Sequence, residues 1–505
     1  MTGGLTRRVV LSWVALAGCH GSSGFRSEDA GGSHAPRDAT TDAPRTHDSG
    51  NVLVDTGCLG TESTTITGKV YDPAGLNPLY HVEVYVPKAP LTPLPKGVPT
   101  GPLACSCGAL FPSGAITSTT TSVDGSFTLR GVPAGPDVPL VLQIGKWRRL
   151  VKLNVDACVD NPQPDGSLSL PATVLEGDTE NSIPEIAVST GLADTLECLM
   201  IRVGLAPTEF VAGYGTTGHV HVFSGGLVRS AADGDAGLNG VGQPEPSPMP
   251  DAPASSESLW RTSNQLMGFD LVLLSCEGGE TYNANPQAME TYLNAGGRVF
   301  ASHYHYAWFS GPLGSGQTYM PPMDWGTNLA TWGDDTVSNT TEPEIGGTLV
   351  TTLNGTGKPF AKGQVLASWL ANVGALSQNS VGPGELSIFD PRFNATVGPA
   401  NAPSQPWILA DTMSDHPGKA MYFSFDTPVN APPAADGGAQ YCGRAVFSDL
   451  HVAGDPSERD NSPPPNGCDP TGLSPQEKAL EFMLFDLSAC VVADQVPGID
   501  AGFPK

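Results

Sequence analysis

The sequence has little positive charge, and several common functional motifs are missing. Lys and Arg number 25 against 51 Asp and Glu, so the formal net charge is −26. Such a surface repels nucleic acid, and we expect no nucleic-acid partner. No P-loop and no Gly-x-Gly-x-x-Gly is present, which removes the usual phosphate-cradling loops. No Cys-x-x-Cys pair occurs, and Cys105-Ser106-Cys107 is too tight for a zinc knuckle.

Long apolar runs are also scarce at the front of the chain. Residues 9–16 are apolar and follow Arg7-Arg8, but a bilayer span needs about 20 such residues. A basic start, a short apolar core and small residues before a cleavage point predict an export signal. The ending Leu16-Ala17-Gly18-Cys19 resembles a bacterial lipobox. That resemblance implies cleavage before Cys19 and a diacylglycerol on its thiol; a plain secretory signal is the alternative.

Composition favours β-rich domains with many turns. Charged residues make up only 15% of the chain, whereas Gly (61) and Pro (47) are abundant and hydrophobic residues reach 39%. A length of 505 residues suggests two to four domains. Assigning Cys19 to lipid leaves an odd number of the 10 cysteines, so most should pair in an oxidising compartment and at least one stays free or bonds another chain.

These patterns divide the chain into five segments. We expect a signal at 1–18, a lipidated cysteine with a disordered tether at 19–61, a β-sandwich at 62–182, an α/β domain at 183–492 and a tail at 493–505. The expected address is the cell envelope, with the lipid as membrane anchor. Because His20 follows Cys19, where an aspartate would signal inner-membrane retention, we place the protein at the outer membrane.

Period-two alternation of apolar residues predicts short strands in the segment 62–182. Strands are expected at 65–71, 81–86, 116–123, 126–129, 138–144 and 150–155, with the turn Asp124-Gly125 closing a hairpin. Gly68-Lys69-Val70-Tyr71-Asp72, Asp124-Gly125-Ser126-Phe127 and Gly131-Val132-Pro133-Ala134-Gly135 resemble the carboxypeptidase regulatory-like (transthyretin-like) domain. The resemblance implies a seven-stranded sandwich without catalytic residues.

Alternating strands and helices from residue 183 predict an open parallel sheet with helices on both faces. Residues 269–274, 292–300 and 443–451 resemble the class I glutamine amidotransferase-like, flavodoxin-like fold, in particular its trehalose-utilisation (ThuA-like) branch. The segment 311–440 does not match and is expected to be a long insertion. The overall expectation is a multi-domain chain, an all-β sandwich followed by an α/β domain.

Polar groups follow three of the expected strands, and sites in open α/β sheets form at the carboxyl ends of strands. These groups are Cys276-Glu277, Ser302-His303-Tyr304-His305 and Asp449-Leu450-His451. In the amidotransferases a cysteine nucleophile occupies the turn at Ser302–His303. None stands here, so we expect no glutaminase activity. The ThuA-like branch carries a histidine at that turn, and the branch is associated with sugar metabolism.

Three interpretations of these groups remain open. Imidazoles and a carboxylate suit a divalent transition metal, and the candidate ligands are His303, His305, His451 and Asp449. On this view His303, His451 and Glu277 are candidate catalytic groups. A hydrolase using Ser302 with His451 and Asp449 is the second interpretation. A hydrogen-bonded polar cluster in a ligand-binding pocket is the third.

Other candidates point to structure. His219 and His221 are interpreted as a satisfied pair, and Cys276 as a buried apolar residue. The aromatic stretch 304–332 is assigned to core packing, with sugar stacking as the alternative. The favoured function is a binding or structural role at the cell surface, with a glycan or a protein as ligand and no certain cofactor. The alternative is a metal-dependent enzyme, a hydrolase acting on carbohydrate.

Overall fold

The structure is a computed structural model of the 505-residue chain. It describes residues 58, 63–99, 105, 110–191, 194–225, 255–314, 316–333, 343–378, 381–431, 441–452, 468, 472–491 and 494. All of these belong to one compact unit, Leu53–Lys505. The predicted signal, the lipidation at Cys19, nearly all of the tether and most of the tail lie outside the described residues.

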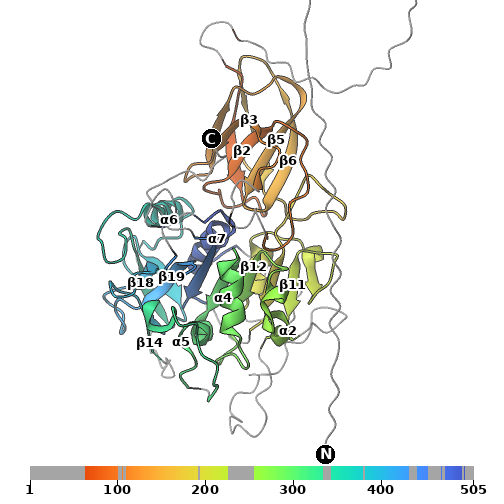
Figure 1. Ribbon diagram of the computed structural model, residues 1–505. Coiled ribbons are helices and arrows are strands. Elements are labelled where there is room, and N and C mark those ends of the chain that lie inside the picture. Colours follow the sequence, from red (N-terminus) through yellow and green to blue (C-terminus); the bar gives the residue numbers. More distant parts are fainter. Residues whose placement is uncertain are drawn as a thin grey trace, which may run out of the picture. The chain divides into compact units, whose positions relative to one another are not determined.

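The first part of the described chain forms two four-stranded sheets (Figure 1). One sheet holds β1 (Thr65–Tyr71), β4 (Ser126–Arg130), β7 (Asp160–Pro162) and β8 (Leu168–Ser169). The other holds β2 (Glu83–Pro87), β3 (Ala115–Thr120), β5 (Gly135–Ile144) and β6 (Trp147–Val155). The six predicted strands are all present. The count is eight rather than the seven that the resemblance implies, because β7 and β8 add short parallel pairings to β1.

A ten-stranded mixed sheet dominates the rest of the chain. Its parallel half runs in the order β10 (Phe210–Ala212), β11 (Val220–Phe223), β9 (Ile186–Ser189), β12 (Leu271–Leu274), β13 (Arg298–Ser302) and β20 (Gly443–Ser448). Its antiparallel half continues with β19 (Ala420–Thr427), β18 (Ser404–Ala410), β15 (Glu344–Leu349) and β16 (Leu386–Phe389). A separate ladder pairs β14 (Thr331–Trp332) with β17 (Ala395–Thr396).

The expectation of a wholly parallel sheet is therefore corrected. Parallel pairing holds from β10 to β20, so the expected parallel arrangement is present in part of the sheet. The segment 311–440 supplies the four antiparallel strands and so extends the sheet. Only β18 and β19 are joined by a short connection, residues 411–419; the other antiparallel neighbours are joined by longer segments, and β15 and β16 have helix α6 between them.

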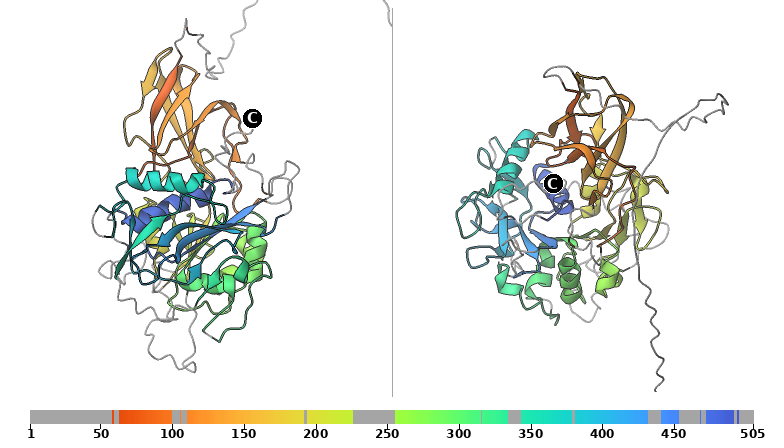
Figure 2. Two further views of the ribbon diagram at one scale, coloured as in Figure 1. Left: turned by 90° about the vertical axis from the view of Figure 1, so that its left-hand side faces the viewer. Right: turned by 45° about the horizontal axis from the view of Figure 1, so that its top comes forward.

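Helices cover both faces of the large sheet because its strands are apolar on both sides. In β12, Leu271 and Leu273 join one core cluster while Val272 and Leu274 join the other. The first face is covered by α1 (Leu196–Arg202), α6 (Ala361–Asn372) and α7 (Pro475–Ser488). The second is covered by α2 (Ser256–Trp260), α3 (Ser263–Leu266), α4 (Pro286–Asn294) and α5 (Tyr306–Ser310). In Figure 2, left, the sheet separates α6 and α7 from α4 and α5.

Buried contacts join the two four-stranded sheets to the large sheet and its helices. Lys146 at the β5–β6 turn pairs with Asp270, which precedes β12. Trp147 packs edge-on against Phe485 of α7, with ring centroids 5.6 Å apart. Trp369 of α6 donates its indole N–H to the carbonyl oxygen of Pro78 at 2.6 Å. The β-sheets and the α/β part therefore share one apolar core cluster.

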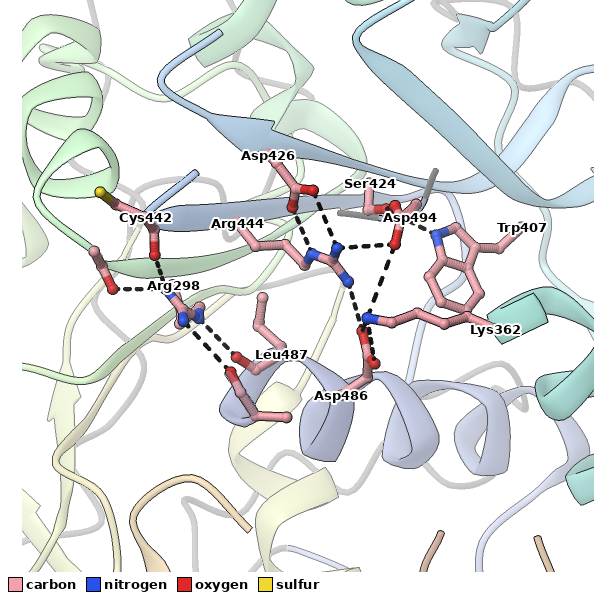
Figure 3. Close-up of polar contacts among 12 residues, drawn as sticks. Arg298, Lys362, Trp407, Ser424, Asp426, Cys442, Arg444, Asp486, Leu487 and Asp494 are labelled. Carbon is pink, nitrogen blue, oxygen red and sulfur yellow. Dashed lines mark hydrogen bonds and ion pairs between the residues drawn. The ribbon is translucent and has the colours of Figure 1, made fainter. Parts of the chain in front are cut away.

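A buried network of charges crosses the first face of the large sheet (Figure 3). The guanidinium of Arg444 in β20 donates to Asp426 at 2.7 Å, to Asp486 at 2.8 Å and to Asp494 at 2.8 Å. Lys362 of α6 adds a second cation, 2.9 Å from Asp486. The network ties β19, β20, α6 and α7 together.

The cysteines pair as an oxidising compartment would allow. Disulfides join Cys58 to Cys158, Cys105 to Cys442 and Cys198 to Cys468, and Cys490 is also disulfide-bonded. Among the described residues, Cys276 is free and buried. Within the same described ranges, no helix combines the length and the hydropathy required to cross a bilayer.

Candidate metal centre

Three adjacent parallel strands bring Cys276, His303 and His451 together. Ala301 of β13 stands opposite Leu274 of β12, and Ser302 stands opposite Ser448 of β20. The carboxyl ends of the three strands therefore meet at one edge, and each candidate side chain follows its strand by one to three residues. One ligand atom from each of Cys276, His303 and His451 lies within 4.8 Å of the others. All three side chains are buried, with at most 3% exposed.

The turn after β13 decides which histidine reaches this cluster. His303 has a φ of +41°, a left-handed conformation that is uncommon for a residue other than glycine. The chain then enters a 3₁₀ helix, His303–His305. His305 therefore does not lie on a strand beside His303, as the spacing suggested, and it is not part of the cluster. Its Nδ1 contacts the carbonyl oxygen of Ser302 at 3.0 Å, and burial lowers its pKa to about 4.

Cys276 lies in a pocket of hydrogen-bond donors. Its Sγ is 3.2 Å from Nδ1 of His303 and accepts backbone N–H groups of Gly278 and Tyr304. Burial raises the pKa of the thiol to about 12, while the two N–H groups act against that rise. N–H groups aimed at sulfur favour a thiolate, and a bound cation supplies the remaining stabilisation because a coordinating thiol is deprotonated. Gly191 makes room for this loop, since a Cβ there would meet the carbonyl oxygen of Cys276 at under 3.0 Å.

The two imidazoles present nitrogen atoms without protein partners. Nε2 of His303 and both ring nitrogens of His451 are buried and make no hydrogen bond. The rings meet edge to face, with centroids 5.2 Å apart. Burial first, and then the neighbouring His451 and Arg392, hold the pKa of His303 well below its usual value. A neutral imidazole with a free lone pair is the form that binds a metal ion.

Asp390 approaches His451 from the inserted segment. Its Oδ2 is 3.5 Å from Nδ1 of His451, and Arg392 grips the same carboxylate with two hydrogen bonds of 2.8 and 3.0 Å. Burial alone would raise the pKa of Asp390, but His451 and Arg392 hold that pKa well below its usual range. Sequence reasoning did not single out Asp390, because nothing in the sequence places residue 390 beside residue 451.

The other predicted residues lie outside the cluster. Ser302 donates its hydroxyl to Asp194, and Asp449 accepts the backbone N–H of Asn394 at 2.9 Å. Each therefore has a structural partner, and no triad of Ser302, His451 and Asp449 is assembled. Glu277 is buried, with 4% exposed, and is not among the three clustered ligands.

Two groups that the sequence assigned to structure are indeed structural. His219 contacts Glu209 at 2.5 Å, and His221 contacts Glu185 at 2.8 Å. In the aromatic stretch four side chains are fully packed in the core, with 2% exposed or less: Tyr306, Trp308, Phe309 and Trp325.

One thiol and two imidazoles form a donor set suited to zinc and similar first-row ions. The prediction of Cys276 as buried is confirmed, but its interpretation as merely apolar overlooked a thiol two residues past a buried strand, at the same sheet edge as His303. That position was a signal the sequence did offer. The chain matches no known family model and no curated protein.

Proposed function

We propose that the protein is a metal-binding component of the cell envelope. The ion is a divalent transition metal, zinc first, and its ligands are Cys276, His303 and His451. The observation that carries the proposal is the convergence of these three side chains, whose ligand atoms lie within 4.8 Å of one another in the core. All three side chains are buried, with at most 3% exposed, so we assign them the binding of an ion and no catalysed reaction.

The proposed cellular location is based on the sequence. The lipobox-like ending at Cys19 supports a lipid anchor, and the disulfides among the described residues agree with an exported protein. Outer-membrane placement and a glycan or protein ligand remain part of the proposal.

The proposed ancestry follows the same resemblances. A transthyretin-like domain over 62–182 is supported by the six strands that form where the alternation of apolar residues predicts them. An amidotransferase-like, ThuA-like domain over 183–492 is supported by the parallel order of β9, β12, β13 and β20 and by the histidine at the turn after β13.

The experiment is metal analysis of the protein purified without a histidine tag, followed by Co²⁺ substitution. We expect about one equivalent of bound metal, and a sulfur-to-cobalt charge-transfer absorption in the Co²⁺ form because one ligand is a thiolate. Cys276→Ser should abolish that absorption and His451→Ala should lower the stoichiometry.

The matched control is His305→Gln, which changes a buried histidine of the same turn outside the cluster. It should keep both the metal and the absorption. The proposal would be overturned if the wild-type protein held less than about 0.2 equivalents of metal and its melting temperature did not change when a chelator was added. A metal ion that binds the folded site stabilises the fold, so its removal should lower the melting temperature.

A further inference from the structure

The inserted segment reaches into the cluster at one residue, Asp390. This residue directly follows β16 and has a φ of +49°, a left-handed conformation that turns the chain sharply. The turn brings Oδ2 of Asp390 to 3.5 Å from Nδ1 of His451. Asp390 is thus an acidic side chain of the segment 311–440 that contacts one of the three clustered ligands.

Several hydrogen bonds fix this approach. The Arg392 guanidinium holds both carboxylate oxygens of Asp390, and the backbone N–H of Asp390 donates to the carbonyl oxygen of Pro343 at 3.1 Å. Gln476 at the start of α7 joins the two segments: its Nε2 donates to the carbonyl oxygen of His451 at 2.5 Å, and its Oε1 accepts the N–H of Phe389 at 2.6 Å. These contacts therefore hold the carboxylate of Asp390 beside the imidazole of His451.

A carboxylate next to one ring nitrogen of a histidine influences which of the two nitrogens carries the proton and which is free to bind a metal ion. Oδ2 of Asp390 is an acceptor, so it favours the imidazole tautomer that carries its proton on Nδ1 of His451. The lone pair is then on Nε2. Both ring nitrogens are buried without a hydrogen bond, and Nδ1 is the one that has a carboxylate oxygen 3.5 Å away. Carboxylates in this position orient metal-binding histidines and raise their basicity.

We infer that Asp390 is a positioning residue that orients His451 for the metal, so that the inserted segment completes the metal centre. The inference rests on the proposed function, because it assigns a role at the same site. It assigns no ligation to Asp390 itself. Its consequence is that ligands on three strands of the parallel sheet bind the ion tightly only while the antiparallel half of the sheet is folded against them.

The test compares Asp390→Asn with wild type in full-length protein, using Zn²⁺ and Co²⁺ as probes. Asn tolerates the left-handed backbone at 390 and keeps the size of the side chain while removing its charge. We expect metal affinity 10- to 100-fold lower, the usual cost of removing such a partner. The charge-transfer absorption of the Co²⁺ form should persist at saturation, because Cys276 still binds.

A second readout needs no metal. Long-range ¹H–¹⁵N correlation of the ring of His451 in metal-free protein should report the proton on Nδ1 in the wild type, and a mixture of tautomers in Asp390→Gly. The control is Asp411→Asn, a buried carboxylate of the inserted segment, whose Oδ1 accepts backbone N–H groups of Met413 and Ser414. It should leave both affinity and tautomer unchanged.

The outcomes separate the two proposals. A wild-type protein that takes up neither ion overturns the proposed function and, with it, the role of Asp390 at the metal. A wild-type protein that binds metal, together with an Asp390→Asn protein of equal affinity and a His451 ring of unchanged tautomer in Asp390→Gly, overturns this inference alone. Equal losses of affinity in Asp390→Asn and Asp411→Asn would also overturn it, since they would indicate a general weakening of the inserted segment.

Discussion

Arg444 is a single residue on which the charge balance of the core depends. It is 1% exposed and contacts three aspartates, of which Asp486 keeps a pKa of about 2 despite burial because Lys362 and Arg444 stabilise its charge. Burial raises the pKa of Asp494, the third carboxylate of the group. The positive charge of Arg444 offsets the cost of burying several carboxylates close together.

Arg444→Met should therefore destabilise the protein strongly. Removing one partner of a buried ion pair leaves uncompensated charge, and such changes cost about 3–5 kcal/mol. Urea unfolding gives the free energy of unfolding. Lys69→Met is the matched control, because Lys69 and Asp124 form an ion pair with both side chains more than a third exposed, and such pairs contribute at most about 1 kcal/mol. Equal losses in the two variants would contradict this account.

At the same scale, the sequence identified two of the three clustered residues. His303 and His451 follow apolar strands directly, and polar residues after buried strands indicate a site edge. His305 was expected beside them because residues two apart share a face of a strand, but the chain leaves the strand at Ser302 and that periodicity no longer applies. Cys276 was set aside because a lone buried cysteine is usually a small apolar residue. Its proximity to His303 is a fact of the sheet order.

At the scale of elements, the loop after β9 and the loop after β12 contact each other next to the three clustered residues. Gly191 closes the turn that leads from β9 towards α1, and its α-carbon lies against the backbone at Ser275 and Cys276. Leu196 at the start of α1 donates its N–H to the hydroxyl of Ser275 at 3.2 Å. Close approach of these two loops holds the thiol in place.

Gly191→Ala should disturb both the fold and the metal site. The added Cβ would overlap the carbonyl group of Cys276, so one loop must move, and overpacking of this kind costs about 1–3 kcal/mol. We expect a lower melting temperature and weaker Co²⁺ binding with a shifted spectrum. Gly398→Ala is the control, because Gly398 has open space around its α-carbon and no left-handed φ. A Gly191→Ala protein with wild-type metal affinity and melting temperature would refute the close-approach argument.

At the scale of the whole molecule, a pair of buried acids links the first sheets to the helical face of the large one. Asp72, after β1, and Glu481 of α7 face each other, and Asn77 donates to Glu481 at 2.8 Å. Burial raises the pKa of Glu481 well above its usual value, and the adjacent Asp72 raises it further; burial also raises the pKa of Asp72. Neutral carboxyl groups therefore suit this junction.

Stability should fall as pH rises through this pair. In the unfolded chain Glu481 titrates near 4.5. Because its folded pKa is higher, the native state holds the proton longer, and the stabilising contribution is complete below 4.5 and is lost as pH rises towards the folded value. Glu481→Gln removes this titration. The free energy of unfolding of the variant, minus that of wild type, should increase from pH 4 to pH 8. A difference that stays constant over this range would contradict the raised pKa of Glu481.

By itself, the sequence determined six of the eight strands of the first two sheets, a parallel sheet with helices on both faces, and the fact that most cysteines form disulfides, because these follow from local periodicity, turn residues and compartment. It placed His303 and His451 at strand ends for the same reason. Tertiary structure alone decided that the segment 311–440 extends the sheet, that Cys276 rather than His305 completes the cluster with the two histidines, and that Asp390 contacts His451. Those outcomes depend on strand order and on contacts between residues far apart in the chain, which no local pattern encodes.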